Sequence, residues 1–373
     1  MQLIIAIVIA IFIFVWQQKL YNRMWDERLK IDISFKDSYV NVGDNSSLIE
    51  VINNDKYLPL PVLHVKFSTA KSFEFENKDN ATVTDCYHRN DAFSVMGNQK
   101  LTRKLTFKAT KRGTFFIQGA TITAKDFFMT KTFAKAMEFN NVLYVFPRKI
   151  DTPEFDAYFN TVMGEIEAKK GLLEDPYTFR GIREYDIRDN MSKINWKSSA
   201  RSGELMVNQY GYSWEPRINI VLNLDTNLMV GSDYITELSI ELASSIAAEF
   251  LDNGISVGLV SNGLDVYKEP LGNLAAGTTM EHMVTIDKYL SSVSGNTELE
   301  GFMEIIDNLV ASYDRDSTYI IISAYHREDL LLKLDYLKGI GMDFHMVVPY
   351  VDIQGIANPR EYMYQWEVEL NEI

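Results

Sequence analysis

The first half of the chain alternates apolar and polar residues with a period of two between residues 31 and 147. Turn residues interrupt the alternation at short intervals, as at Gly43-Asp44 and Arg112-Gly113. Such a pattern predicts strands with one buried face and one solvated face. It is clearest at residues 47–51, 62–67, 100–109, 114–117, 120–124 and 142–146. Short strands at this spacing predict an antiparallel β-sandwich of immunoglobulin-like type over residues 31–147.

A different pattern follows, in which apolar strands and amphipathic helices take turns from residue 217 to residue 350. Residues 217–224 are almost continuously apolar, as in a parallel strand covered on both faces. Residues 235–253 place apolar side chains on one helical stripe that Gly254 ends. Further strands are predicted at residues 255–260, 318–323 and 344–348, and helices at 278–293, 298–313 and 327–338. This alternation predicts a doubly wound, Rossmann-type α/β domain, with residues 351–373 left as a C-terminal extension.

The N-terminus carries fourteen uninterrupted apolar residues from Leu3 to Trp16. A membrane crossing needs roughly 17 to 20 residues, which residues 1–18 just reach. We therefore predict a transmembrane anchor over residues 1–18 and a basic juxtamembrane segment over residues 19–30. Lys and Arg follow the apolar run and none precedes it, so the positive-inside rule predicts a single-pass protein of the cell (inner) membrane with its body in the cytoplasm. A buried helix of a soluble protein is the alternative.

Composition narrows the classes of function. The net charge is −14, which argues against a general nucleic-acid binder because such proteins neutralise phosphates with a basic face. One cysteine, Cys86, allows neither an intrachain disulfide nor a thiolate metal site. The first strand of the α/β half is not followed by a glycine-rich phosphate loop, so no nucleotide or other small-molecule substrate is evident.

Residues 148–216 join the two halves, and the part from Arg180 to Arg201 is locally basic in an acidic protein. We expect a short helix near residues 155–169, a helix across residues 190–201 capped by Asp189 and ended by Gly203, and a strand over residues 205–210. The second helix and the strand are expected to introduce the α/β domain, the strand as its edge strand. The candidate partner-binding residues of this segment are Arg180, Arg183, Tyr185, Asp189, Trp196, Arg201 and Glu215.

Three interpretations of this segment compete. Tyr185 and Trp196 could fill a seam between the two halves, with the arginines paired to neighbouring carboxylates. Arginine and tryptophan are also common anchors of protein interfaces, so the segment could be a docking face. A catalytic role for Asp189 or Glu215 beside Arg201 is the third interpretation, although no nucleophile and base stand together in the sequence.

A degenerate metal site is the other candidate. Ligands of open α/β sheets lie at the carboxyl ends of the strands, where the chain has Asp225 and Asn227. Von Willebrand A-type domains carry a DxSxS motif for Mg²⁺ at this place, but here Met229 replaces its last oxygen. Thr297 could add a hydroxyl. Asp225 is otherwise expected to cap the turn after its strand.

Several of these residues fall into a known pattern. The run Phe179-Arg180-Gly181-Ile182-Arg183-Glu184-Tyr185, followed by Asp189, Ile194, Trp196, Ala200-Arg201, Leu205 and Val207, resembles the signature of the DUF58 family. The likeness extends over residues 30–350 and includes Asp126-Phe127-Phe128. Arg188, Ser192 and Met129 depart from the family pattern, and the family commonly has two membrane helices.

The resemblance implies a membrane-anchored protein with a von Willebrand A-like domain, associated with a MoxR-type AAA+ ATPase. We therefore expect a non-enzymatic, membrane-tethered adaptor or scaffold without a resident cofactor, Mg²⁺ at Asp225 being the one exception considered. Two alternatives remain open at this point. One is a divalent-metal-dependent hydrolase that uses the α/β domain, and the other is a purely structural envelope protein.

Overall fold

The computed structural model describes residues 1–77, 80–172, 174–212, 216–225, 232–265, 272–294, 300–311, 314, 317–350 and 359–367. By its contacts the chain divides into two compact units. The first comprises Met1–Arg148 with Leu290–Ser292, and the second comprises Lys149–Tyr289 with Val293–Ile373. Each unit is described by itself below.

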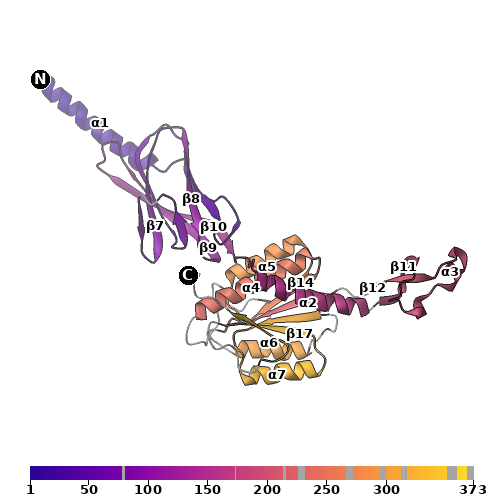
Figure 1. Cartoon of the computed structure of the whole chain (residues 1–373). Coiled ribbons are helices and arrows are strands. Elements are labelled where there is room, and N and C mark those ends of the chain that lie inside the picture. Colours follow the sequence, from indigo (N-terminus) through magenta and orange to yellow (C-terminus); the bar gives the residue numbers. More distant parts are fainter. Residues whose placement is uncertain are drawn as a thin grey trace. The chain divides into compact units, whose positions relative to one another are not determined.

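The first unit begins with the helix α1 (Gln2–Met24), which is long and apolar enough to cross a membrane (Figure 1). The apolar side chains from Leu3 to Trp16 are exposed. The helix extends six residues beyond the expected anchor, because Gln17 and Tyr21 are buried and Tyr21 donates to the Pro59 carbonyl oxygen at 2.7 Å. Part of the expected juxtamembrane segment is therefore helix packed on protein.

Ten strands of the first unit form two sheets that pack as a sandwich. One sheet has the order β1-β3-β8-β5 and the other has the order β2-β10-β9-β4-β7-β6. Every pair of neighbouring strands is antiparallel except β2 and β10, which are parallel, so the purely antiparallel expectation was wrong at that edge. The strands are β1 (Leu29–Phe35), β2 (Tyr39–Asn41), β3 (Asn45–Asn54), β4 (Leu60–Ala70), β5 (Phe73–Phe75), β6 (Ala81–Val83), β7 (Cys86–Val95), β8 (Gln99–Ala109), β9 (Gly113–Lys125) and β10 (Thr132–Phe146).

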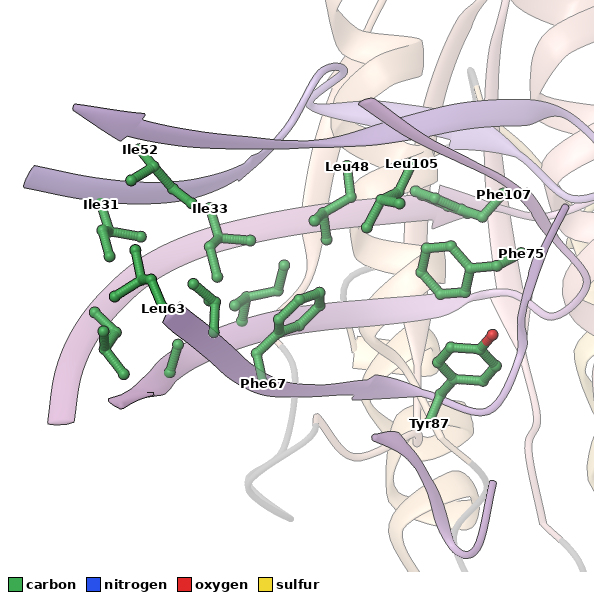
Figure 2. Close-up of a cluster of buried hydrophobic side chains, with 14 of the residues drawn as sticks. Ile31, Ile33, Leu48, Ile52, Leu63, Phe67, Phe75, Tyr87, Leu105 and Phe107 are labelled. Atoms are coloured by element: carbon green, nitrogen blue, oxygen red, sulfur yellow. The ribbon is translucent and has the colours of Figure 1, made fainter. Parts of the chain in front are cut away.

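The apolar positions of the period-two pattern meet between these two sheets. Figure 2 shows Ile33, Leu48 and Phe107 from one sheet facing Leu63 and Phe67 from the other. All five are nearly or fully buried. The two separate strands expected on either side of Gly119 are one strand, β9. Gly119 allows this because a Cβ there would lie 2.6 Å from the carbonyl oxygen of Met137 on β10.

The second unit contains a six-stranded sheet with the order β15-β14-β13-β16-β17-β18. Strands β14, β13, β16, β17 and β18 are parallel to one another, and β15 is antiparallel to β14. Figure 1 shows α4 and α5 on one face of the sheet and α6 and α7 on the other. The elements are α2 (Pro153–Leu172), β13 (Arg217–Leu222), α4 (Ser232–Asp252), β14 (Ser256–Ser261), β15 (Leu274–Gly277), α5 (Met280–Ser292), α6 (Glu300–Ala311), β16 (Ser317–Ile322), α7 (Glu328–Gly339), β17 (Phe344–Tyr350) and β18 (Met363–Glu367).

The chain beyond residue 350, which we expected to stand apart from the sheet, supplies the edge strand β18. Its residues pair in parallel with β17, and Trp366 and Tyr364 contact Phe155 and Tyr158 of α2 with ring centroids 6.2 and 4.8 Å apart. The pattern did not reveal this strand because only Trp366 among its five residues is buried. An edge strand with a mixed pattern lacks the continuous apolar run of its buried neighbours.

Candidate functional site

Much of the segment that joins the two halves forms a two-stranded ribbon that we call the arm, residues 174–212. It consists of β11 (Glu174–Glu184), the short 3₁₀ helix η1 (Met191–Lys193), α3 (Trp196–Ser202) and β12 (Met206–Tyr212) (Figure 1). Among the described strands, β11 and β12 pair only with each other. We expected β12 but not β11, and we expected an edge strand of the α/β sheet where the structure has a separate ribbon.

Local capping explains why the arm has two short helices instead of the one helix expected across residues 190–201. The Asn190 side chain accepts from Ser192 N and caps η1, and the Asn195 side chain accepts from Ser198 N and caps α3. Ile194, which lies between the two helices, forms a bridge with Val207 of β12. Gly203 ends α3 with a φ of 79°, as expected, because glycine has no Cβ to oppose a left-handed conformation.

Asp189 does not cap a helix, because it is bound by Arg183. The Arg183 guanidinium donates from Nη1 to Oδ2 at 2.6 Å and from Nη2 to Oδ1 at 2.5 Å, and the backbone N of Asp186 donates to Oδ2 at 2.8 Å. These hydrogen bonds hold the pKa of Asp189 at about 2, below its usual range. The pair ties β11 to the loop that follows it, which is a structural task for both residues.

Several large apolar and basic side chains of the arm are exposed. Trp196 is 67% exposed, so the arm itself covers little of this side chain. Tyr185 is half-buried, whereas Arg180 and Arg201 are exposed. Other large apolar side chains exposed on the arm are Tyr177, Phe179, Ile182, Ile187, Met191 and Leu205. Glu215 lies outside the described residues.

The carboxyl ends of the central parallel strands hold a network of amides and hydroxyls. Asn223 follows β13, and its Nδ2 donates to Ser323 Oγ at 2.9 Å beyond β16. Asn262, which follows β14, donates from Nδ2 to Asn223 Oδ1 at 2.9 Å and accepts from Leu224 N at 2.8 Å. The three polar side chains are buried and satisfy one another.

Asp225 stands at the rim of this network, where its backbone N donates to Asn223 Oδ1 at 3.1 Å. Asp225 is buried, and it lies at the point where the strand order reverses between β13 and β16. Asn227 and Thr297, the other expected ligands, lie outside the described residues. Within the described part of the chain, no group of three or more His, Cys, Asp or Glu side chains could hold a metal ion. The donors gathered around Asp225 are amides and a hydroxyl, which Mg²⁺ binds less readily than carboxylates.

A third polar cluster had no signal in the sequence, since its members are distant in the chain. Lys149 Nζ donates to Asp287 Oδ1 at 3.0 Å and also to Ser244 Oγ, while Ser244 Oγ donates to Asp287 Oδ1 at 2.5 Å. Burial lowers the pKa of Lys149 and raises the pKa of Asp287, and the pair of charges opposes both changes. Ser244 is fully buried, so its hydroxyl cannot meet a substrate. We interpret the cluster as a clamp that joins the start of the second unit to α4 and α5.

Fold and site together define a class of protein, one with an apolar N-terminal helix, a β-sandwich and a mixed α/β unit that carries a two-stranded arm. The model of the family described as "Protein of unknown function DUF58" matches residues 181–347. Over that region the chain belongs to the DUF58 family, which confirms the resemblance seen in the sequence. The matched region includes most of the arm and the sheet up to β17.

Solved structures resemble the chain over about a third of its length. A CARDB domain from Pyrococcus furiosus, in complex with di-metal ions, is 15% identical, with 32% of this chain and 91% of that chain covered and a TM-score of 0.19. A non-cellulosomal cohesin from Archaeoglobus fulgidus is 14% identical, with 35% and 97% covered and a TM-score of 0.22. At such TM-scores the description of the fold rests on the chain's own strand pairing. The comparison with curated proteins finds no significant match.

Proposed function

We propose that the protein is a non-enzymatic adaptor, tethered to a membrane by α1, that presents its arm to a protein partner. In this proposal the immunoglobulin-like sandwich separates the membrane from a von Willebrand A-like α/β unit, and the arm is the docking element of that unit. The observation that carries the proposal is that Trp196 and Arg201 are both exposed on the same short helix. Tryptophan and arginine are among the residues most often found as anchors of protein interfaces.

The partner that we propose is a MoxR-type AAA+ ATPase. This choice comes from the family to which residues 181–347 belong and from the associations that the family resemblance implies. The basic side chains from Arg180 to Arg201 outnumber the acidic ones and suit an acidic face on that partner, because complementary charge speeds association and selects the orientation. No described feature favours the hydrolase alternative, since the buried network at Asp225 offers neither a metal cluster nor an accessible nucleophile.

A binding measurement with purified components tests this proposal. The full-length protein in lipid nanodiscs is immobilised, and the MoxR-type ATPase of the same organism is titrated with and without ATP. We expect the variants Trp196→Ala and Arg201→Glu each to weaken binding about tenfold or more, as hot-spot residues do. Lys66→Glu and Val83→Ala, at exposed positions of the sandwich, are the matched controls for charge and for apolar area.

Two results would contradict the proposal. If the wild-type protein does not bind the ATPase in either nucleotide state, the choice of partner is wrong. If the arm variants bind as well as the sandwich controls do, the arm is not the docking element.

A further inference from the structure

One end of the sandwich, which we call the proximal end, carries most of its exposed apolar side chains. Strands β3, β7 and β9 finish there and strands β4, β8 and β10 start there, so three turns meet at that end, over residues 55–59, 96–98 and 126–131. The large apolar side chains exposed on these turns are Tyr57 (90%), Met96 (63%), Phe127 (59%), Phe128 (48%) and Met129 (58%). In the described rest of the sandwich strands and turns, only Tyr39 and Val83 are comparable, and both lie toward the opposite end.

The turn over residues 126–131 is fastened to α1 through a buried carboxylate. Asp126 Oδ2 accepts from Gln17 Nε2 at 2.8 Å and from Thr130 Oγ1 at 2.7 Å, while Oδ1 accepts from Lys131 N at 2.8 Å. Burial alone would raise the pKa of Asp126, but these hydrogen bonds outweigh it and hold the pKa at about 2. The ionised carboxylate therefore keeps the turn and the helix together at every ordinary pH.

The contacts with α1 place this turn beside the apolar run of the helix. The rings of Phe14 and Phe128 have centroids 5.9 Å apart, and Phe14 belongs to the run that ends at Trp16. Gln17, the next residue after the run, is already buried, so no spacer separates the apolar run from the sandwich. Tyr21, which binds the turn over residues 55–59, lies about 10 Å farther along the helix from Phe14, at a rise of about 1.5 Å per residue. Phe127 to Met129 are therefore the part of the sandwich nearest to the apolar run.

Charges around the proximal end fit an anionic lipid surface. Lys125 and Lys131 flank the apolar turn, and Lys19, Arg23 and Arg28 follow the apolar run on the helix side. Of the acidic residues near the helix end, Asp26 is paired with Lys135 at 2.9 Å, Asp126 is buried, and Glu27 is exposed next to Arg28 in the sequence. Basic side chains next to a bilayer gain from the negative potential of anionic headgroups, and aromatic rings favour the interfacial depth. This charge pattern favours lipid over an apolar protein surface as the partner of the turn.

We propose that Phe127, Phe128 and Met129 form a second membrane contact, which inserts into the headgroup and upper acyl region of an anionic bilayer beside α1. This inference rests on the proposed membrane anchor. The turn adds apolar area at the membrane interface. Because Asp126 binds the turn to α1, the helix and the turn contact the membrane as one rigid unit. The sandwich is then held at a set orientation to the membrane instead of swinging on a flexible linker.

Depth-dependent fluorescence quenching tests this inference on the full-length protein, because the chain has a single cysteine, Cys86, which is exposed on β7 at the opposite end of the sandwich. Three proteins carry an environment-sensitive label: the wild type at Cys86, and the Cys86→Ser background with either Phe128→Cys or Ala10→Cys. Each is reconstituted in phosphatidylcholine vesicles with roughly one quarter phosphatidylglycerol, which supplies the anionic surface. Lipids with spin labels at shallow and deep acyl positions serve as quenchers.

We expect the label at position 128 to be quenched several-fold more by the shallow lipid than by the deep one, and the label at Cys86 to be quenched by neither. The label at position 10 should be quenched most by the deep lipid. If position 10 is not quenched, the membrane anchor itself is wrong. If position 10 is quenched and position 128 behaves like Cys86, the anchor stands and the second contact is overturned; the turn would then be covered by protein or left in water.

Discussion

At the scale of single residues, the sandwich contains a buried glutamate whose neighbouring arginines bind a different acidic residue. Glu50 of β3 is 1% exposed and stands opposite Arg103 of β8, yet neither of its carboxylate oxygens has a hydrogen-bond partner among the described residues. Arg103 and Arg89 instead bind Asp91, each at 2.9 Å. Burial and the charge of Asp91 raise the pKa of Glu50 to about 7, against the opposing effect of the two arginines.

The pH dependence of stability follows from this raised pKa. An unfolded glutamate has a pKa of about 4.3, so the native state holds a proton that the unfolded state has lost, and the free energy of unfolding should fall as pH rises from about 4.3 through about 7. We expect Glu50→Gln to remove this fall and to stabilise the sandwich by up to about 3 kcal/mol at pH above about 8. Hydrogen exchange of the sandwich strands at acidic and alkaline pH measures this change in the free energy of unfolding. Glu74→Gln, at an exposed position of β5, is the control; equal pH profiles for wild type and Glu50→Gln would contradict the prediction.

At the scale of elements, the arm and β18 differ in what they contribute to the second unit. The strands of the arm pair only with each other in the described structure, and the larger apolar side chains on its surface are exposed. By contrast, β18 continues the main sheet and buries Trp366 against Phe155 of α2. The arm is therefore an appendage of the unit, whereas β18 is part of its core.

Removal of the arm should leave the α/β unit folded. We expect replacement of residues 177–210 by a short glycine-serine loop to change the stability of the unit by less than about 1 kcal/mol, since it removes no neighbour of the main sheet. Trp366→Ala should cost about 3 kcal/mol or more, because it empties a buried aromatic site. Hydrogen exchange of α4 and β16 compares the stability of the arm replacement with that of Trp366→Ala. A large loss of protection in the arm replacement would show that the arm supports the sheet.

At the scale of the whole molecule, the apolar helix and the acidic body have to lie in different surroundings. The run from Leu3 to Trp16 is exposed in the structure and would be covered by lipid, whereas the chain as a whole has a net charge of −14. Basic residues follow the run, and such residues are retained on the cytoplasmic side of a membrane. The side on which the body lies is thus a prediction that one labelling experiment can test.

Cys86 reports the side because it is the single cysteine and is exposed. In spheroplasts we expect a membrane-impermeant maleimide to leave Cys86 unmodified until the membrane is permeabilised, since the positive-inside rule places the body in the cytoplasm. Gel-shift of the labelled protein gives the modified fraction, and Cys86→Ser shows the background. Rapid labelling in sealed spheroplasts would place the body outside.

Much of the fold follows from the sequence alone, because periodicity is a local property of the chain. The α1 helix, most of the sandwich strands and the alternating strands and helices after residue 217 could be predicted from which positions are apolar, and the end of α3 from Gly203, the residue best suited to its left-handed conformation. The family signature likewise lies within one continuous stretch.

Only the tertiary structure decided which distant residues meet. It turned the signature into an exposed ribbon instead of an edge strand, satisfied Asn223 with Ser323 and Asn262, and joined Lys149 to Ser244 and Asp287. It also brought Asp126 against Gln17, and so set an apolar turn beside the apolar run of α1. Contacts of this kind depend on how strands and helices pack against one another, and a pattern along the chain carries no record of which polar groups will be buried together.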